Sequence, residues 1–123
     1  MAFHFIVMKI TKVKENRDFR RAYNKAKSYV SPFFVVYIMK NRNLGVRLGI
    51  TTGKKIGKAV CRNRAKRLIT AAFRECLPRL SGNFDFIIVA RPRILTAKSN
   101  IVAESMLKLF RTAEIGSVGE NNE

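Results

Sequence analysis

The sequence predicts a single α+β domain in which helices cover a β-sheet, as in a two-layer α/β sandwich. Segments with helical apolar spacing alternate with short, continuously apolar runs that are rich in β-branched and aromatic residues. The length of 123 residues suits one domain, and a hydrophobic content of 47% is sufficient for a core. We place this domain at residues 1–115, with an extended or frayed segment at 1–9, and we expect a disordered tail at 116–123.

The first part of the chain predicts a helix and a short strand. Asn16 is a suitable N-cap for a helix that ends near Lys27. Its apolar stripe consists of Phe19, Ala22, Tyr23 and Ala26. Residues 29–30 predict a very short strand, and Ser31 and Pro32 break the pattern after it.

Two longer strands are predicted next. Residues 33–39 are continuously apolar, which predicts a strand covered on both faces. Residues 45–51 alternate, with apolar side chains on one side and Arg47 on the other. Because the two strands are close in sequence, we expect them to form an antiparallel pair.

The second half predicts a helix, a strand and a helix. Their expected bounds are 58 or 59 to 77 for a basic helix, 84–90 for a buried strand, and 99 or 100 onward for the last helix. If the strands at 45–51 and 84–90 are parallel neighbours, the basic helix is their crossover. The general expectation for such a crossover is a right hand.

The chain is strongly basic, with 25 Lys and Arg against 8 Asp and Glu, a net charge of +17. Such a charge attracts polyanions, and nucleic acid is the expected partner. Eight of the basic residues lie between Gly53 and Arg74. An apolar series on the same helix forms its underside: Cys61, Ala65, Leu68, Ile69, Ala72 and Cys76. The two cysteines are about 22 Å apart along that helix, beyond disulfide reach, so we expect both to be small core residues.

Residues for covalent catalysis are not recognisable in the sequence. The single histidine is His4, and no two carboxylates have the spacing of a two-metal nuclease site. Asp18 is expected in the first turn of its helix, where a carboxylate is stabilised by the helix dipole. The run at Gly53 lacks the other residues of a phosphate-binding Walker loop. We therefore expect a binding protein without catalytic residues of its own.

Phosphate binding is the chemistry that the sequence offers most clearly. On the basic helix, Arg62 and Lys66 form one ridge, and a second ridge consists of Arg64, Arg67 and Arg74. Asn63 can reach a base or sugar edge, and Lys54 and Lys55 precede the helix N-terminus, which also attracts phosphate. The alternative is a solvated charged face. The aromatic residues Phe19, Tyr23 and Tyr37 suit base stacking or core packing, and spacing alone favours the core.

The segment from Lys54 to Phe73 resembles the signature of the bacterial ribonuclease P protein component. The matching residues are Lys54 to Gly57, Ala59 and Val60, Arg62 to Arg64, Lys66 to Ile69, and Ala72 and Phe73. The similarity extends from about Lys12 to Arg111, although Thr70 stands where many members carry Arg. This resemblance implies the order α-β-β-β-α-β-α, a four-stranded sheet and a left-handed β-α-β crossover.

The resemblance also implies a function. The protein would join a catalytic RNA, ribonuclease P RNA, and promote endonucleolytic removal of the 5′ leader from precursor tRNA. Mg²⁺ would be held mainly by the RNA subunit, and neither a membrane nor a small-molecule substrate would be involved. The implied leader-binding residues are Phe19, Tyr23, Tyr37, Arg62 and Lys66, and those facing the RNA subunit are Lys54, Lys55, Asn63, Arg64 and Arg67.

Two other classes of function remain open from the sequence. A structural RNA-binding protein, such as a small ribosomal protein, would have the same size and charge. A membrane-surface amphipathic helix would need the apolar underside of the basic helix to be free, whereas the fold needs it for the core. We find no signal peptide or run of transmembrane length and expect a cytoplasmic protein, and Met8 suggests that residues 1–7 are an upstream extension.

Overall fold

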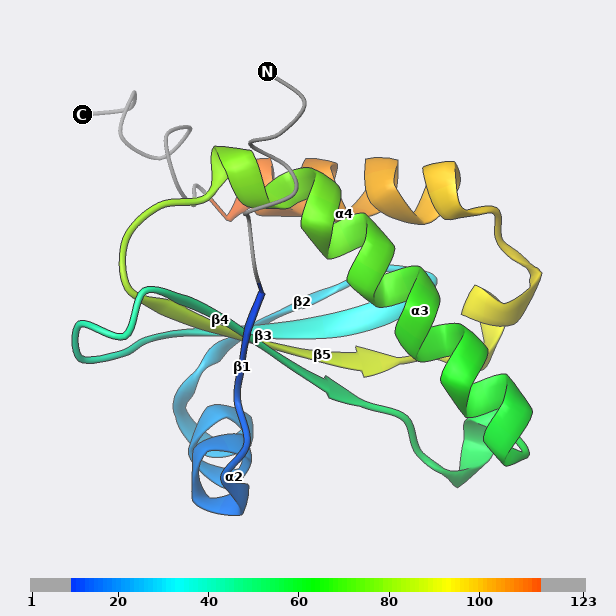
Figure 1. Ribbon diagram of the computed structural model, residues 1–123, viewed down its shortest axis with the longest axis horizontal. Helices are drawn as coiled ribbons and strands as arrows, with labels where there is room; N and C mark the ends of the chain where they lie inside the picture. The colour runs from blue at the N-terminus through cyan, green and yellow to red at the C-terminus, as the bar shows by residue number, and fades with distance from the viewer. Residues whose placement is uncertain (1–9, 114–123) are drawn as a thin grey trace.

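A computed structural model of the chain describes residues 10–113 (Figure 1). It contains a five-stranded sheet in the order β1-β4-β5-β3-β2. The strands are β1 (Thr11–Lys12), β2 (Lys27–Val30), β3 (Phe34–Lys40), β4 (Val46–Thr51) and β5 (Phe84–Ala90). Strands β1, β4 and β5 are parallel, whereas β3 is antiparallel to β5 and β2 is antiparallel to β3. The predictions for segment 1–9, with its extension and His4, and for the tail at 116–123 lie outside the described residues.

Within residues 10–113, three α-helices pack on the two faces of this sheet. They are α2 (Asn16–Lys25), α3 (Ala59–Cys76) and α4 (Ser99–Thr112), and short 3-10 turns are η1 (Lys54–Ile56), η2 (Leu77–Arg79) and η3 (Pro92–Thr96). Figure 1 shows α3 and α4 together on one side of the sheet and α2 alone on the other. The α+β class is therefore confirmed, and one face of the sheet has much less helical cover than the other.

The predicted pairing of the first two long strands is wrong. β3 and β4 run antiparallel but are not neighbours, because β5 lies between them and pairs with both. β5 carries four consecutive buried residues, 85–88, and a strand that is buried on both faces belongs in the centre of a sheet. The loop of five residues between β3 and β4 is long enough to pass the end of β5, a distance of two strand spacings or about 10 Å. β4 and β5 are parallel neighbours, so the predicted crossover through α3 is confirmed. The left-handed sense of that crossover, which the family resemblance implies, stays a prediction.

The sheet has five strands rather than the four expected. The additional strand is β1, which pairs with β4 over Thr11 and Lys12, and the Val13 amide donates to the Leu48 carbonyl at 2.9 Å. The sequence shows no strand pattern here, because two paired residues are too few for a period of two to appear. The short strand expected at residues 29–30 is present and begins earlier, at Lys27. Because β2 begins there, α2 ends at Lys25.

The main core lies between the sheet and helices α3 and α4. Three aromatic rings meet there, with centroid separations of 5.4 Å for Phe73 and Phe86 and 5.1 Å for Phe86 and Phe110. The predicted underside of α3 is buried at Ala65, Ile69, Ala72 and Cys76, and Phe73 is buried with them. Cys61 and Leu68 are only half-buried against the core. This packing uses the apolar face of α3 and leaves its basic face to solvent.

The two cysteines are expected to differ in reactivity toward alkylating reagents. Both are free thiols, but Cys76 is buried, and burial raises the pKa of its thiol to about 11. At pH 8 only about one in a thousand Cys76 side chains is then a thiolate, which is the reactive form. Mass spectrometry after brief iodoacetamide treatment of the native protein should find label on Cys61 and almost none on Cys76. Equal labelling before unfolding would contradict this placement.

Candidate nucleic-acid interface

The less covered face of the sheet carries a regular grid of side chains. On β4, Arg47, Gly49 and Thr51 alternate with residues that enter the main core. The strand register places Gly49, Ile87 and Tyr37 in one row across β4, β5 and β3, and Thr51, Val89 and Val35 in the next. The prediction that β3 is covered on both faces is thus only half right. Phe34, Val36 and Ile38 are buried, but Val35, Tyr37 and Met39 on this face are only partly buried.

Helix α2 covers the row that contains Ile87. Ala22 and Ile87 are buried together with Val13, and Phe19 and Tyr37 pack against them partly exposed. Phe19 fits over Gly49, because a Cβ atom at that position would lie 2.8 Å from its ring. The absence of a side chain at Gly49 therefore allows α2 to approach β4 closely.

Replacing Gly49 with Ala is expected to destabilise the domain. The new Cβ would also lie 2.8 Å from Ile87 Cδ1, so Phe19 and α2 must shift. Such overpacking costs about 1–3 kcal/mol, which urea unfolding of the variant would measure. Gly53→Ala is the matched control, since its Cβ would meet no atom within 4 Å. Equal stability of the two variants would contradict the close packing of α2 on β4.

Tyr23 is the most accessible aromatic residue of this face, with 40% of its surface exposed. Its ring meets the Tyr37 ring edge-on, with centroids 5.1 Å apart and planes at 76°. Its hydroxyl is hydrogen-bonded to Thr51 Oγ1 at 2.8 Å. Two tyrosine rings with free area, supported by a sheet, form a surface on which an unpaired base can stack.

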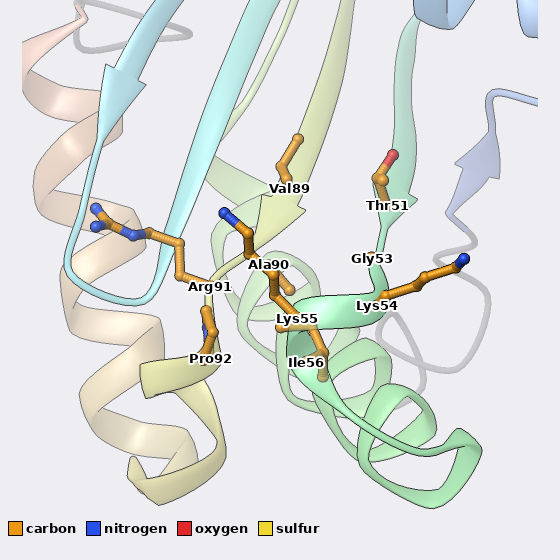
Figure 2. A pocket seen from close by; sticks show the side chains of 9 residues that line it. All are labelled: Thr51, Gly53, Lys54, Lys55, Ile56, Val89, Ala90, Arg91 and Pro92. Carbon is orange, nitrogen blue, oxygen red and sulfur yellow. The ribbon is translucent and has the colours of Figure 1, made fainter.

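A groove of about 520 Å³ continues from this surface at the ends of β4 and β5 (Figure 2). Thr51 and Val89 belong both to the open face and to the groove wall. Figure 2 shows Lys54, Lys55 and Arg91 around the groove, with the side chain of Lys55 reaching up beside β5. The Arg91 side chain turns aside, and its Nη1 donates to the Ser31 carbonyl at 3.1 Å. An apolar groove between lysines suits a nucleotide, whose base is apolar on its faces and whose phosphate is anionic.

The outer face of α3 is a second, larger cationic surface. Its exposed basic and amide side chains are Asn63, Arg64, Lys66, Arg67 and Arg74, with Lys58 at the N-cap, and Glu75 is the single acid of the helix. Arg62 is partly buried, because its Nη1 donates to the Gly57 carbonyl at 2.6 Å across the helix N-terminus. None of the ion pairs among residues 10–113 involves a basic residue of α3. These charges are therefore available to an external polyanion.

Comparison with known proteins assigns the chain to a family. The Ribonuclease P family matches the chain over residues 7–114. The chain belongs to the ribonuclease P protein family. The ribonuclease P protein component of Thermoanaerobacter sp. (strain X514) is 42% identical over 103 residues, which cover 83% of this chain and 88% of the relative.

Solved structures of ribonuclease P proteins have the same fold. The Staphylococcus aureus protein, determined at 2.0 Å, superposes with a TM-score of 0.76 at 32% identity and covers 89% of this chain and 100% of its own. The Thermotoga maritima protein gives a TM-score of 0.72 at 30% identity, covering 80% and 93%. The chain is thus a ribonuclease P protein component, an RNA-binding subunit of an endoribonuclease that matures the 5′ end of tRNA, and the catalytic RNA is the other subunit.

The structure divides the predicted site of this ribonuclease P protein into two groups. Phe19, Tyr23 and Tyr37 come together on the face that α2 covers, whereas Arg62 and Lys66 belong to α3 on the opposite face (Figure 1). The family resemblance assigns Lys54 and Lys55 to the RNA subunit together with residues of α3. In the structure they line the groove that adjoins the aromatic face, which gives them access to a strand lying there.

One charged cluster of this ribonuclease P protein does not follow from the sequence patterns. Arg47 Nε and Nη2 each donate to an oxygen of Asp85 at 2.7 Å, and Nη2 lies 3.5 Å from Asp18 Oδ2. The hydrogen bond to Asp85 is the main reason that the pKa of Arg47 is raised. Asp85, an acid inside the otherwise apolar run 84–90, could have indicated such a cluster, because a buried carboxylate requires a partner. Asp18 stands in the first helical turn as expected, with this additional contact.

Proposed function

We propose that this ribonuclease P protein binds the 5′ leader of precursor tRNA on the aromatic face and ribonuclease P RNA on the outer face of α3. The observation that supports this most is the continuity of the Tyr23 and Tyr37 rings with the lysine-rimmed groove, through Thr51 and Val89. A single strand needs both a stacking surface for bases and cations for phosphates, and this face offers them side by side.

The leader runs, in this proposal, across the row of Thr51, Val89 and Val35 toward the groove. Phe19, Tyr23 and Tyr37 contact the bases, and Lys54 and Lys55 neutralise phosphates at the groove. The side chains of Val35 and Val89 are partly exposed and add apolar area without base-specific hydrogen bonds. Such contacts favour single strands of many sequences, because every base has an apolar face.

The RNA subunit is the proposed partner of Asn63, Arg64 and Arg67. These three side chains are exposed within about one turn of α3, and the two arginine forks are suited to phosphate oxygens. Arg62 and Lys66 are proposed to lie where the leader and the RNA subunit meet. The hydrogen bond to the Gly57 carbonyl holds the Arg62 side chain close to the end of η1, the turn that contains Lys54 and Lys55.

The described residues do not fit a magnesium site. No group of three or more His, Cys, Asp and Glu side chains among residues 10–113 is placed to hold a metal ion, and Asp18 and Asp85 are both engaged by Arg47. We propose that the Mg²⁺ of the reaction is held mainly by the RNA subunit. No helix within the same range has the length and apolarity needed to cross a membrane. We place the holoenzyme in the cytoplasm, where precursor tRNA is made.

Reconstitution tests this proposal against that of a structural RNA-binding protein. The full chain is mixed with a bacterial ribonuclease P RNA and precursor tRNA at low Mg²⁺, where RNA alone cleaves poorly. The proposal predicts that the chain raises the rate of 5′ cleavage, and more for a precursor with a leader of several nucleotides than for one with a single nucleotide. Binding of the RNA without any gain in cleavage would favour the structural alternative.

A further inference from the structure

Helix α2 is attached to the sheet at two points along β4. Near its start, Asp18 faces Arg47, and near its end the Tyr23 hydroxyl meets Thr51. Arg47 and Thr51 lie four residues apart on the same face of β4, with Gly49 between them under the Phe19 ring. The stacking side chains of α2 are therefore held between two polar contacts.

The contacts of Arg47 with Asp18 and Asp85 are largely shielded from solvent. The side chains of Arg47 and Asp18 are each 15% exposed, and that of Asp85 is 12% exposed. Asn41 Nδ2 donates to Asp85 Oδ1 at 2.8 Å and so orients the carboxylate that grips Arg47. Asp85 of β5, held by Asn41 of the β3–β4 loop, thereby fixes the position of Arg47. The Nη2 atom of Arg47 also lies near Asp18 of α2.

Several features of α2 make its contact with Arg47 important for where the helix lies on the sheet. The helix has ten residues with Ala22 alone fully buried, and a helix of this length is not stable without tertiary contacts. Six of its residues are exposed basic or amide side chains: Asn16, Arg17, Arg20, Arg21, Asn24 and Lys25. The chain has only 8 acids against 25 basic residues, yet a carboxylate of α2 is directed at Arg47 beside an anion-binding face. Phe19 is the next residue in the chain, so a shift at Asp18 moves its ring.

We propose that Arg47 is a positioning residue for leader recognition: through Asp18 it sets where α2 lies on the sheet and so where Phe19 and Tyr23 meet the leader. The proposal rests on the assignment of the leader to this face. It gives Arg47 no contact with RNA.

Asp18→Asn tests the proposal in the assembled holoenzyme. The variant keeps the shape of the side chain and leaves the Arg47–Asp85 pair intact. The affinity for precursor tRNA with a leader, divided by the affinity for mature tRNA, should fall about fivefold, because misplaced rings lose part of the stacking free energy. Glu15→Gln is the matched control, since it removes the same charge from an exposed position at the start of α2 and should leave the ratio unchanged.

Two further variants separate positioning from general stability. Asp18→Glu keeps the charge and should recover part of the ratio. Arg47→Lys keeps the positive charge but cannot bridge both carboxylates as the fork does, and it should reproduce the loss seen with Asp18→Asn. Thermal unfolding identifies any variant that is not folded at the assay temperature.

The outcomes distinguish this inference from the proposed function. A ratio of one for the unmodified protein would overturn the leader assignment itself. A ratio well above one that Asp18→Asn and Arg47→Lys leave unchanged would overturn the positioning role alone. Equal weakening of both substrates would also overturn it, because that result describes a general loss of RNA affinity.

Discussion

Replacing Arg64 and Arg67 together with Ala is expected to lower the affinity for ribonuclease P RNA by at least about 100-fold at moderate salt. Each exposed arginine contributes a charge-assisted hydrogen bond to phosphate, worth about 1.5–3 kcal/mol. Neither has an intramolecular ion pair within residues 10–113 that its loss would break, so the fold should be unaffected. Filter binding at several salt concentrations measures both the affinity and its salt dependence.

The salt dependence makes this prediction specific. Two lost phosphate contacts should reduce the slope of log affinity against log salt by about 1.5–2 units. The matched control is Lys108→Ala with Arg111→Ala, which removes the same charge from exposed positions on α4. An equal loss in the control would mean that the RNA senses only net charge, and an unchanged slope in the α3 variant would refute its phosphate contacts.

Replacing Tyr23 with Ala is expected to weaken binding of leader-bearing tRNA about tenfold and to leave mature tRNA unaffected. Stacking of one base on an aromatic ring is worth about 1–3 kcal/mol, and Tyr23 has the most exposed ring of the aromatic face. Tyr23→Phe is the control. It keeps the ring and removes only the hydroxyl contact with Thr51, so most of the affinity should remain.

Phe19→Ala should act in the same direction, with a less direct interpretation. Its ring packs against Gly49 and the buried residues around Ile87, so its removal also creates a cavity beneath α2. Tyr23 separates the two effects better because its ring lies at the surface. Equal weakening of both tRNA substrates by Tyr23→Ala would mean that the ring only supports the fold.

The helices and long strands are predictable because each has a clear local pattern: helical apolar spacing, strict alternation, or an unbroken or nearly unbroken apolar run. The apolar spacing of the basic helix predicts a start at residue 58 or 59, the helix begins at Ala59, and its apolar underside is mostly buried. The place of β5 between β3 and β4 does not follow from local pattern, because a hairpin explains two neighbouring strands equally well. The relevant signal is the run 84–90 of β5, which is apolar except for Asp85, since a strand buried on both faces belongs in the centre of a sheet.

The site is predictable in chemistry more than in arrangement. Composition identifies a polyanion binder, and spacing places Phe19 and Tyr23 on one helical stripe. Spacing alone cannot decide whether those rings pack or stack, because that depends on how much of the sheet α2 leaves open. The Arg47 cluster escapes sequence patterns because its members come from α2, β4 and β5, and only the tertiary register brings them together.

The most direct test of this division of surfaces is crosslinking in the assembled holoenzyme. A precursor tRNA carrying 4-thiouridine at single leader positions is bound to the complex, irradiated and digested, and the crosslinked peptides are identified by mass spectrometry. A parallel experiment places 4-thiouridine in the RNA subunit. The two sets of contacts are then compared in the same complex.

We predict that leader crosslinks fall on the aromatic face and its groove, at Tyr23, Tyr37 and residues 51–55, and that RNA-subunit crosslinks fall on the outer face of α3. Leader crosslinks confined to α4, or to the edge of the sheet at β2, would contradict the assignment of the leader to the aromatic face.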